Sequence, residues 1–192
     1  VSQWITGSDA RRDGHAWRAR ACAILTGIGT VRDDDPQLLV RDVETTRQPL
    51  RVVVDSRFEI PLTARILQGG PVLLVGAVEN AEKIQMLRSA GNFVEILKNP
   101  AGKVDLKALL ELLAQRGINE VHAEAGFKLN GSLMREGLVD ELLLYLAPCL
   151  IGHDASGLFN LPELTTLDDR RRLQIRDLRQ VGEDIRLIAR LR

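Results

Sequence analysis

Residues 105–146 decide the fold class and read DLKALLELLAQRGINEVHAEAGFKLNGSLMREGLVDELLLYL. Four leucines between residues 106 and 113 fall on one face of a predicted helix. A short strand over residues 120–124, a glycine turn and a second helix over residues 127–136 follow, and residues 140–146 form an apolar strand. This alternation of helices and strands is typical of an α/β fold with a mostly parallel sheet.

The chain on both sides continues this pattern. Upstream, we predict helices over residues 10–20 and 81–89 and strands over residues 22–25, 50–55, 71–75 and 93–97. Asn80 and Asp105 are placed to cap helices. Downstream, a surface loop over residues 152–170 precedes two alternating segments, 173–181 and 184–191, which form a hairpin. Together these elements predict a three-layer α/β fold, whose mostly parallel sheet ends in an antiparallel edge.

Composition excludes several classes of partner. The 192 residues include 26 Lys and Arg and 26 Asp and Glu, so the formal charge is zero, and a neutral chain is a poor candidate for sequence-independent nucleic-acid binding, which needs a basic face. Hydrophobic residues at 45% and charged residues at 27% are typical of a globular domain. The longest nearly apolar stretch, Leu142–Gly152, is too short to cross a bilayer, and the N-terminus resembles no secretory signal. We therefore expect neither a nucleic acid nor a membrane as partner.

The cysteines and histidines predict no metal site. Cys22 and Cys149 cannot form a disulfide framework or a four-cysteine zinc site, and both lie in apolar runs, so we expect buried thiols in a reducing cytoplasm. His122-Ala123-Glu124 has the His-x-Glu spacing of zinc deaminases, but that chemistry also needs a Pro-Cys-x-x-Cys pair. Pro148-Cys149 has no second cysteine at that spacing, so we interpret His122 as a strand residue. We interpret Asp33–Asp35 as a solvated run rather than a cation site.

Two glycine turns follow predicted strands. Gly27-Ile28-Gly29-Thr30 follows the strand over residues 22–25, and Glu124-Ala125-Gly126 leads from the strand over residues 120–124 into a helix. At the carboxyl ends of parallel strands, such turns let the backbone approach a phosphate, and helix N-termini offer N–H groups to anions. The dinucleotide fingerprint is absent, because its third glycine and downstream acid are missing. A plain strand-to-helix turn remains an alternative for each motif.

Several spaced segments occur in one order along the chain. They include Ser2-Gln3-Trp4-Ile5-Thr6, Gly27-x-Gly29-Thr30-Val31, Asp34-x-Pro36-x-Leu38, Gln48-Pro49-x-Arg51-Val52-Val53-Val54-Asp55-Ser56, Glu124-x-Gly126, Gly137-Leu138-Val139-Asp140-Glu141 and Val181-Gly182-x-Asp184. In this order they resemble the reductase domain of the bifunctional riboflavin-biosynthesis deaminase/reductase. The likeness runs from residue 2 to the C-terminus, except between about residue 60 and residue 115, where no segment is distinctive of the family.

The resemblance implies a dihydrofolate-reductase-like fold, a homodimer and a reaction. The reaction is NADPH-dependent reduction of 5-amino-6-(5-phosphoribosylamino)uracil to 5-amino-6-(5-phosphoribitylamino)uracil, a step of riboflavin biosynthesis. The resemblance implies that the substrate is held by Ser2, Arg18, Leu38, Arg41 and Glu124. It implies that NADP is held by Trp4, Thr30, Asp34, Ser56 and a turn formed by Gly126, Phe127, Lys128, Leu129, Asn130, Gly131 and Ser132.

The chemistry of these residue types agrees with the resemblance. Arg18 and Arg41 suit the substrate 5-phosphate, although single arginines are more often solvated. The N-terminus of the helix over residues 127–136 suits the cofactor pyrophosphate. Asp34 and Glu124 are the candidate catalytic side chains, for proton delivery or polarisation at the reacting carbon.

The end of the strand over residues 50–55 bears on cofactor choice. Ser56 and Arg57 suit the 2′-phosphate of NADPH, whereas Asp55 is an acid of the kind that selects NADH. Because successive side chains of a strand alternate between faces, we expect Asp55 to point away from Ser56. We therefore expect NADPH to be preferred.

Residues 1–192 are predicted to form a single pyrimidine reductase domain. The family has a strand ending in Ser-Leu-Asp-Gly just before the segment that begins at Ser2, and this strand would lie inside the sheet; neither it nor a zinc deaminase domain is found in these residues. We expect the domain to be fused to a zinc deaminase domain or to follow one. Two alternatives stay open: a reductase of this fold for another pterin or pyrimidine, and a non-catalytic dimerisation or binding remnant.

Overall fold

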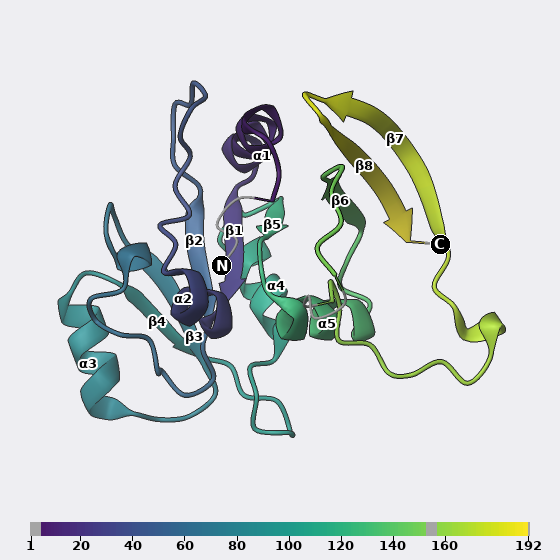
Figure 1. The fold of residues 1–192 in the computed structure, drawn as a ribbon. Coiled ribbons are helices and arrows are strands. Elements are labelled where there is room, and N and C mark those ends of the chain that lie inside the picture. Colours follow the sequence, from purple (N-terminus) through teal and green to yellow (C-terminus); the bar gives the residue numbers. More distant parts are fainter. Residues whose placement is uncertain (1–4, 153–156, 192) are drawn as a thin grey trace.

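A five-stranded parallel sheet forms the centre of the computed structural model, which describes residues 5–152 and 157–191 (Figure 1). The strand order is β4-β3-β2-β1-β5, and all neighbours run parallel. The bounds are β1 (Ala23–Gly27), β2 (Leu50–Val54), β3 (Val72–Gly76), β4 (Phe93–Ile96) and β5 (Val121–Ala123). Each predicted strand is confirmed to within two residues, because a short apolar run between glycine or proline turns is a strong strand signal.

Helices cover both faces of this sheet, which confirms the three layers. On one face lie α2 (Ile28–Asp34) and α3 (Ala81–Ser89), and on the other lie α4 (Leu106–Gln115) and α5 (Phe127–Arg135). Side chains alternate between the two cores, so Ile24 of β1 packs with the first pair of helices and Leu25 with the second. Full burial of each such side chain contributes about 1.5–3 kcal/mol. Both strand faces are therefore apolar.

The predicted caps fix where two of these helices begin. The Asn80 side chain accepts the N–H of Lys83 at 3.1 Å, and that of Asp105 accepts the N–H of Ala108 at 2.9 Å. Each bond satisfies one of the N–H groups that the first turn of a helix leaves without a partner. Short 3₁₀ turns lie at Arg65–Leu67 and Leu167–Asp169.

The C-terminal hairpin is confirmed, but its predicted place at the edge of the parallel sheet is wrong. β7 (Leu173–Val181) and β8 (Asp184–Leu191) pair with β6 (Glu141–Leu146) in a separate antiparallel sheet of order β6-β8-β7 (Figure 1). Within the described ranges, β6 pairs with β8 and not with β5. A cleft separates β5 from β6, so the two sheets do not join.

Helix α1 (Ser8–Arg20) connects the two sheets. Asp13 accepts hydrogen bonds from the Tyr145 hydroxyl at 2.6 Å and from Nη1 of Arg186 at 2.9 Å. Burial and the bond to Asp13 raise the pKa of Tyr145. At the start of α1, the N–H of Gly7 donates to Asp184 at 2.8 Å. One face of the antiparallel sheet is therefore polar and packed against α1.

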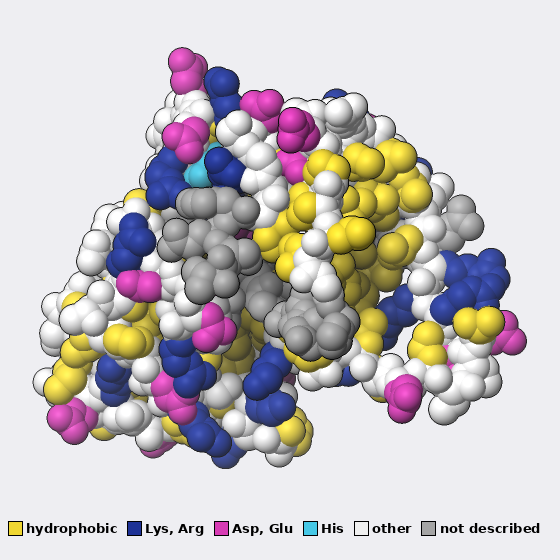
Figure 2. All heavy atoms as spheres, viewed as in Figure 1, with side chains coloured by type: hydrophobic (Ala, Val, Ile, Leu, Met, Phe, Trp, Pro, Cys, Tyr) yellow, Lys and Arg dark blue, Asp and Glu magenta, His cyan; other side chains and the backbone are white. Residues whose placement is uncertain are grey.

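The opposite face of the antiparallel sheet is apolar and exposed. Leu146, Ile175, Leu178 and Ile185 are each more than two-fifths exposed. The register places Leu178 across from Leu187, and Leu187 across from Leu144, so these leucines share one face. Figure 2 shows hydrophobic side chains gathered over the part of the view that β6, β7 and β8 occupy in Figure 1.

The expectation of two buried thiols is wrong. Cys22 is only partly buried, and Cys149 is exposed, because it follows the end of β6 in a segment that leaves the sheet. The described part of the loop over residues 152–170 lies mostly at the surface, as predicted. Across the described ranges, no helix combines the length and apolar character that a membrane span needs.

Candidate active site

The carboxyl ends of β1 and β5 lie at the switch point of the sheet, where β1 passes directly into α2. The chain runs outward from β1 to β4 on one side and returns to place β5 on the other side of β1. Parallel sheets bind ligands at such a point, beyond the carboxyl ends of their strands. Thr30, in α2, lies close to Gly126, whose Cβ position is 3.6 Å from Oγ1 of Thr30. Two residues predicted for the cofactor are thus brought together.

Gly126 is the N-cap of α5, and no side chain caps this helix. Its φ of −80° and ψ of 173° are open to any residue, so the turn does not need glycine for its dihedral angles. What glycine provides here is an unobstructed helix N-terminus, where N–H groups and the helix dipole favour an anion.

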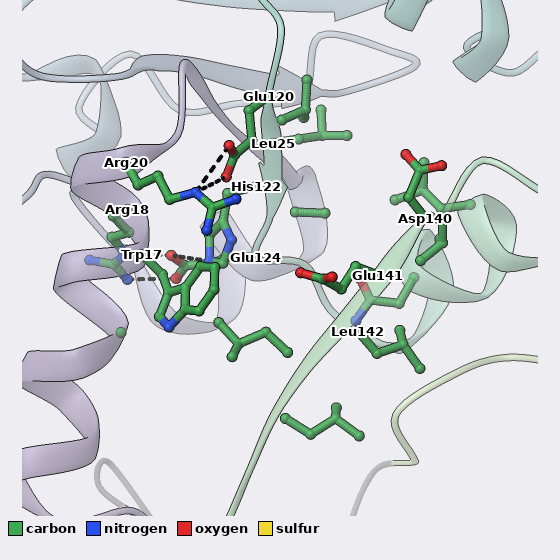
Figure 3. A pocket seen from close by; sticks show the side chains of 18 of the residues that line it. Trp17, Arg18, Arg20, Leu25, Glu120, His122, Glu124, Asp140, Glu141 and Leu142 are labelled. Carbon is green, nitrogen blue, oxygen red and sulfur yellow. Dashed lines mark hydrogen bonds and ion pairs between the residues drawn. The ribbon is translucent and has the colours of Figure 1, made fainter. Parts of the chain in front are cut away.

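A cleft of about 860 Å³ lies between β5, β6 and α1. Its lining includes Arg18, Arg41 and Glu124 from the predicted substrate set and Asn130 from the predicted cofactor set. Figure 3 shows Glu120, His122 and Glu124 directed toward α1, with Glu141 and Leu142 of β6 across the cleft. The structure therefore gathers residues that are more than a hundred positions apart in the sequence.

Arg18 and Glu124 form a two-bond ion pair within this cleft. Nε of Arg18 lies 2.5 Å from Oε1 of Glu124, and Nη2 lies 2.6 Å from Oε2 (Figure 3). Burial raises the pKa of Glu124, but the hydrogen bonds from Arg18 and His122 outweigh burial and hold this pKa at about 2. Glu124 is therefore ionised at neutral pH.

His122 is the strand residue that we predicted, and it also contacts Glu124. Its Nε2 lies 3.4 Å from Oε1 of Glu124. Two residues earlier on the same face of the strand, Glu120 pairs with Arg20 at 3.2 Å. The alternation of side chains along residues 120–124 explains this row of polar groups opposite α1, and the sequence contained that signal.

Most of the predicted cofactor residues lie outside the cleft lining, and so does Leu38 of the predicted substrate set. Leu38 is buried in the core and has a φ of 52°. Asp34 is exposed at the last position of α2. Ser56 follows β2 at the carboxyl edge of the sheet, where its carbonyl accepts the N–H of Ala77. Ser2 and Trp4 lie outside the described residues.

The carboxylate of Asp55 folds into the turn that follows β2, where its Oδ1 accepts the N–H of Arg57 at 3.4 Å. The Asp55 side chain is 1% exposed and accepts the N–H of Ile60 at 2.8 Å. The carboxylate therefore belongs to the turn itself. Arg57 is exposed, and its Nη1 lies 3.8 Å from Oε1 of Glu59.

Residues 157–161 lie against the first two turns of α5, which contain the predicted cofactor residues from Phe127 to Ser132. The Asn160 N–H donates to the carbonyl of Phe127 at 3.0 Å, and the Asn160 carbonyl accepts from Arg135. A Cβ at Gly131 would overlap the backbone of Asn160. The side chain of Asn130 donates to the Ala125 carbonyl at 2.7 Å. Lys128 and Leu129 lie in the first turn of α5, and Ser132 donates to the Lys128 carbonyl at 3.2 Å.

The structure is that of a three-layer α/β protein whose parallel sheet lies between helices. A charged cleft beside the switch point of the sheet is typical of proteins of this class that bind small ligands. The chain belongs to the RibD C-terminal domain family, whose model matches residues 1–187.

Individual relatives agree with this family. The chain is 40% identical to the riboflavin biosynthesis protein RibD of Haemophilus influenzae, over 97% of this chain and 52% of the relative. It is 31% identical to the 5-amino-6-(5-phosphoribosylamino)uracil reductase of Buchnera aphidicola, over 97% of this chain and 95% of the relative. In structure it is similar to Acinetobacter baumannii RibD, form 2, with a TM-score of 0.85 and 37% identity, over 99% of this chain and 52% of that chain. The chain thus spans about half the length of the RibD relatives.

Proposed function

We propose that this domain carries out the NADPH-dependent reduction of 5-amino-6-(5-phosphoribosylamino)uracil to the ribitylamino product. The observation that carries this proposal is one cleft that gathers Arg18, Arg41 and Glu124 with Asn130 of the α5 turn. The Buchnera relative, of nearly the same length, bears the name of this reductase. The Haemophilus influenzae relative bears the name of a riboflavin biosynthesis protein.

The carboxyl edge of the sheet fits a nicotinamide dinucleotide. Ser56, Thr30 and Gly126 follow β2, β1 and β5, three neighbouring strands, so they form a row along this edge. We assign the pyrophosphate to the uncapped N-terminus of α5 and the 2′-phosphate to Ser56 and Arg57. NADPH, when bound, supplies the hydride for the reduction.

We assign the substrate phosphate chiefly to Arg41. Its side chain is exposed and lines the cleft. The guanidinium of Arg18 is already engaged, because it bonds Glu124 twice and also donates to the Leu39 carbonyl at 3.2 Å. Arg18 therefore acts in this proposal by orienting Glu124 and the segment that precedes Arg41.

The reduced atom is the first carbon of the ribosyl group, which ring opening presents as an imine carbon, so that hydride addition there and a proton on the nitrogen give the ribitylamino product. The reaction also needs a proton, and Glu124 is ionised at neutral pH, so it serves as an acceptor that orients the substrate. Asp34 is the other candidate, but it lies outside the lining of the cleft. We propose that water or the substrate phosphate delivers the proton.

We also propose that the edges of β5 and β6, which face each other across the cleft, take up the further strand that the resemblance predicts. The substrate then occupies the part of the cleft beyond the carboxyl end of β5, where Glu124 and its partner Arg18 lie. Within the described residues, β5 pairs on one side with β1, and β6 on one side with β8, so each keeps an edge that a strand can join. Adding a strand that ends in Ser-Leu-Asp-Gly before Val1 is expected to slow amide exchange in both β5 and β6. Unchanged exchange in both strands would contradict this placement.

Two further associations complete the proposal. The apolar face of the antiparallel sheet supports a homodimer, because such a face is stabilised by burial against a second copy. The length of the RibD relatives, about twice that of this chain, supports fusion to a zinc deaminase domain or a position after one. We place the protein in the cytoplasm, where reducing conditions keep Cys22 and Cys149 as thiols.

The decisive experiment measures NADPH oxidation with the phosphoribosylaminouracil substrate and, in parallel, with dihydrofolate. Turnover of the first and not the second is the expected result. Turnover of dihydrofolate alone would indicate a reductase for another pterin or pyrimidine. Failure to bind NADPH in a titration, both with and without the added strand, would indicate a non-catalytic domain.

A further inference from the structure

The segment that contains Arg41 has an energetically unfavourable backbone conformation at two positions. Leu38 has a φ of 52° and Asp42 a φ of 60°, and both lie in the left-handed region that side chains other than glycine rarely adopt. Such a segment keeps its shape only where neighbouring groups hold it. Arg41 lies between these two residues, so the position of its guanidinium depends on what fixes this backbone.

Three side chains hold the backbone of three consecutive residues here. Arg18 donates to the Leu39 carbonyl at 3.2 Å. Gln48 accepts the Val40 N–H at 2.7 Å and donates to the Val40 carbonyl at 3.2 Å. Nδ1 of His15 accepts the Arg41 N–H at 3.1 Å. His15 is the one of these three side chains whose hydrogen-bonding role depends on its protonation state.

We propose that neutral His15 is a positioning residue for Arg41. This inference rests on the proposed role of Arg41 at the substrate phosphate. His15 lies on α1, is 7% exposed and makes the bond that fixes the Arg41 backbone from the side of the helix. No functional role for His15 follows from the resemblance, and the sequence motifs do not include it.

The geometry fixes the tautomer. Because Nδ1 accepts a hydrogen bond, the proton of the neutral ring lies on Nε2, which faces Asp42 at 4.0 Å. Protonation of Nδ1 would place an N–H against the N–H of Arg41 and remove this bond. Acidification therefore releases the Arg41 backbone from α1.

The surroundings favour the neutral ring. Burial lowers the pKa of His15, and the charges of Arg18 on the same helix and Arg41 on the loop lower it further. Asp42 on the loop and Glu124 at the end of β5 act in the opposite direction, and burial with the two arginines prevails. Near neutral pH the ring thus stays an acceptor.

The test measures the affinity of the wild type and of three single variants, His15→Phe, His15→Gln and Arg41→Ala, for ribose 5-phosphate as the probe. His15→Phe keeps a buried ring without an acceptor and should weaken ribose 5-phosphate about 2- to 12-fold, the loss expected for one neutral hydrogen bond. His15→Gln keeps an acceptor and does not titrate, so it should bind like wild type at pH 7.5. NADPH affinity should not change in either variant.

The pH dependence separates positioning from a structural role. The probe phosphate itself titrates in every variant, so the ratio of wild-type to His15→Gln affinity is followed from pH 8 to pH 5.5. This ratio should fall as pH falls, because only wild type loses its acceptor. Nitrogen NMR of the wild type should show that Nδ1 of His15 carries no proton at pH 7.5. The chain has three histidines, and the signals of the His15 ring are identified because they are absent from the spectrum of His15→Gln.

The outcomes are distinguishable. If Arg41→Ala leaves ribose 5-phosphate binding unchanged, the proposed role of Arg41 fails, and the role of His15 fails with it. If Arg41→Ala weakens binding but His15→Phe does not, the His15 inference alone is overturned. A proton on Nδ1 at pH 7.5 overturns it as well, and so does a constant affinity ratio over the pH range in which NMR shows that the His15 ring becomes protonated; neither result relies on the fold of His15→Phe.

Discussion

At the end of β5, the hydrogen bonds from Arg18 and His122 keep the Glu124 carboxylate ionised, and this makes the stability of the fold depend on pH. The folded-state pKa of Glu124 is about 2, below the value near 4.3 of an unfolded chain, so its contribution is present above that value and lost as pH falls toward 2. Two pKa units correspond to about 3 kcal/mol, which is an upper bound for a partly exposed pair.

Urea unfolding between pH 5 and pH 2 measures this contribution. Glu124→Gln should show a shallower loss of unfolding free energy than wild type over this range. Glu79→Gln, which removes an exposed carboxylate, is the matched control. Equal slopes for wild type and Glu124→Gln would show that the pair with Arg18 does not stabilise the fold.

Arg41→Ala is expected to weaken the substrate far more than NADPH. Loss of one arginine–phosphate contact costs about 1.5–3 kcal/mol, or roughly 10- to 150-fold in affinity. Arg20→Ala is the control, because Arg20 lines the same cleft but pairs with Glu120. Calorimetric titration with each ligand checks the prediction, and an effect on NADPH alone would place Arg41 on the cofactor side.

Cofactor choice is expected to favour NADPH over NADH. Asp55 is buried in its own turn and cannot bind the 2′-OH of NADH, whereas Arg57 is exposed beside Ser56. The measurement is the ratio of kcat/KM for the two cofactors in wild type and in Arg57→Ala. A wild-type ratio near one would refute the preference, and a preference that survives in Arg57→Ala would assign the 2′-phosphate to Ser56 and other groups.

At the scale of elements, α5 depends on a glycine where it meets residues 157–161. Alanine usually stabilises a helix interior over glycine by about 0.5–1 kcal/mol, and Gly14→Ala in α1 should show this gain because no described atom lies within 4 Å of its Cβ position. Gly131→Ala should instead destabilise by about 1–3 kcal/mol, since its Cβ overlaps the Asn160 backbone.

Thermal unfolding and NADPH titration together test this contact. Gly131→Ala should also weaken NADPH, because displacement of residues 157–161 disturbs the turn that begins at Gly126. A gain in stability equal to that of Gly14→Ala would show that the segment yields without cost.

The elements themselves were predictable because their signals are local. The leucine spacing of α4, the caps Asn80 and Asp105, and the alternating residues of β7 and β8 act within a few positions. Their bounds follow the sequence closely. The pairing of β6 with β8 was missed, because strand partners depend on contacts that neither strand encodes alone.

At the scale of the whole molecule, the apolar face of the antiparallel sheet predicts dimerisation. Leu178→Glu places a charge on this face and should convert a dimer to a monomer, because burial of an unpaired charge is costly. Leu167→Glu, at an exposed leucine outside the sheet, should leave the dimer intact. Sedimentation analysis at matched concentrations distinguishes them, and a monomeric wild type would contradict the prediction.

The sequence by itself determined the elements, their order and the layers of the fold, since apolar periodicity, caps and glycine turns are properties of neighbouring residues. Only the tertiary structure decided the pairing of Arg18 with Glu124, the bond from His15 to Arg41 and the exposure of Cys149. These depend on which elements meet in space, across 106 residues for the first pair. Burial and charge partners, which set the pKa of a group, arise only when that packing is complete.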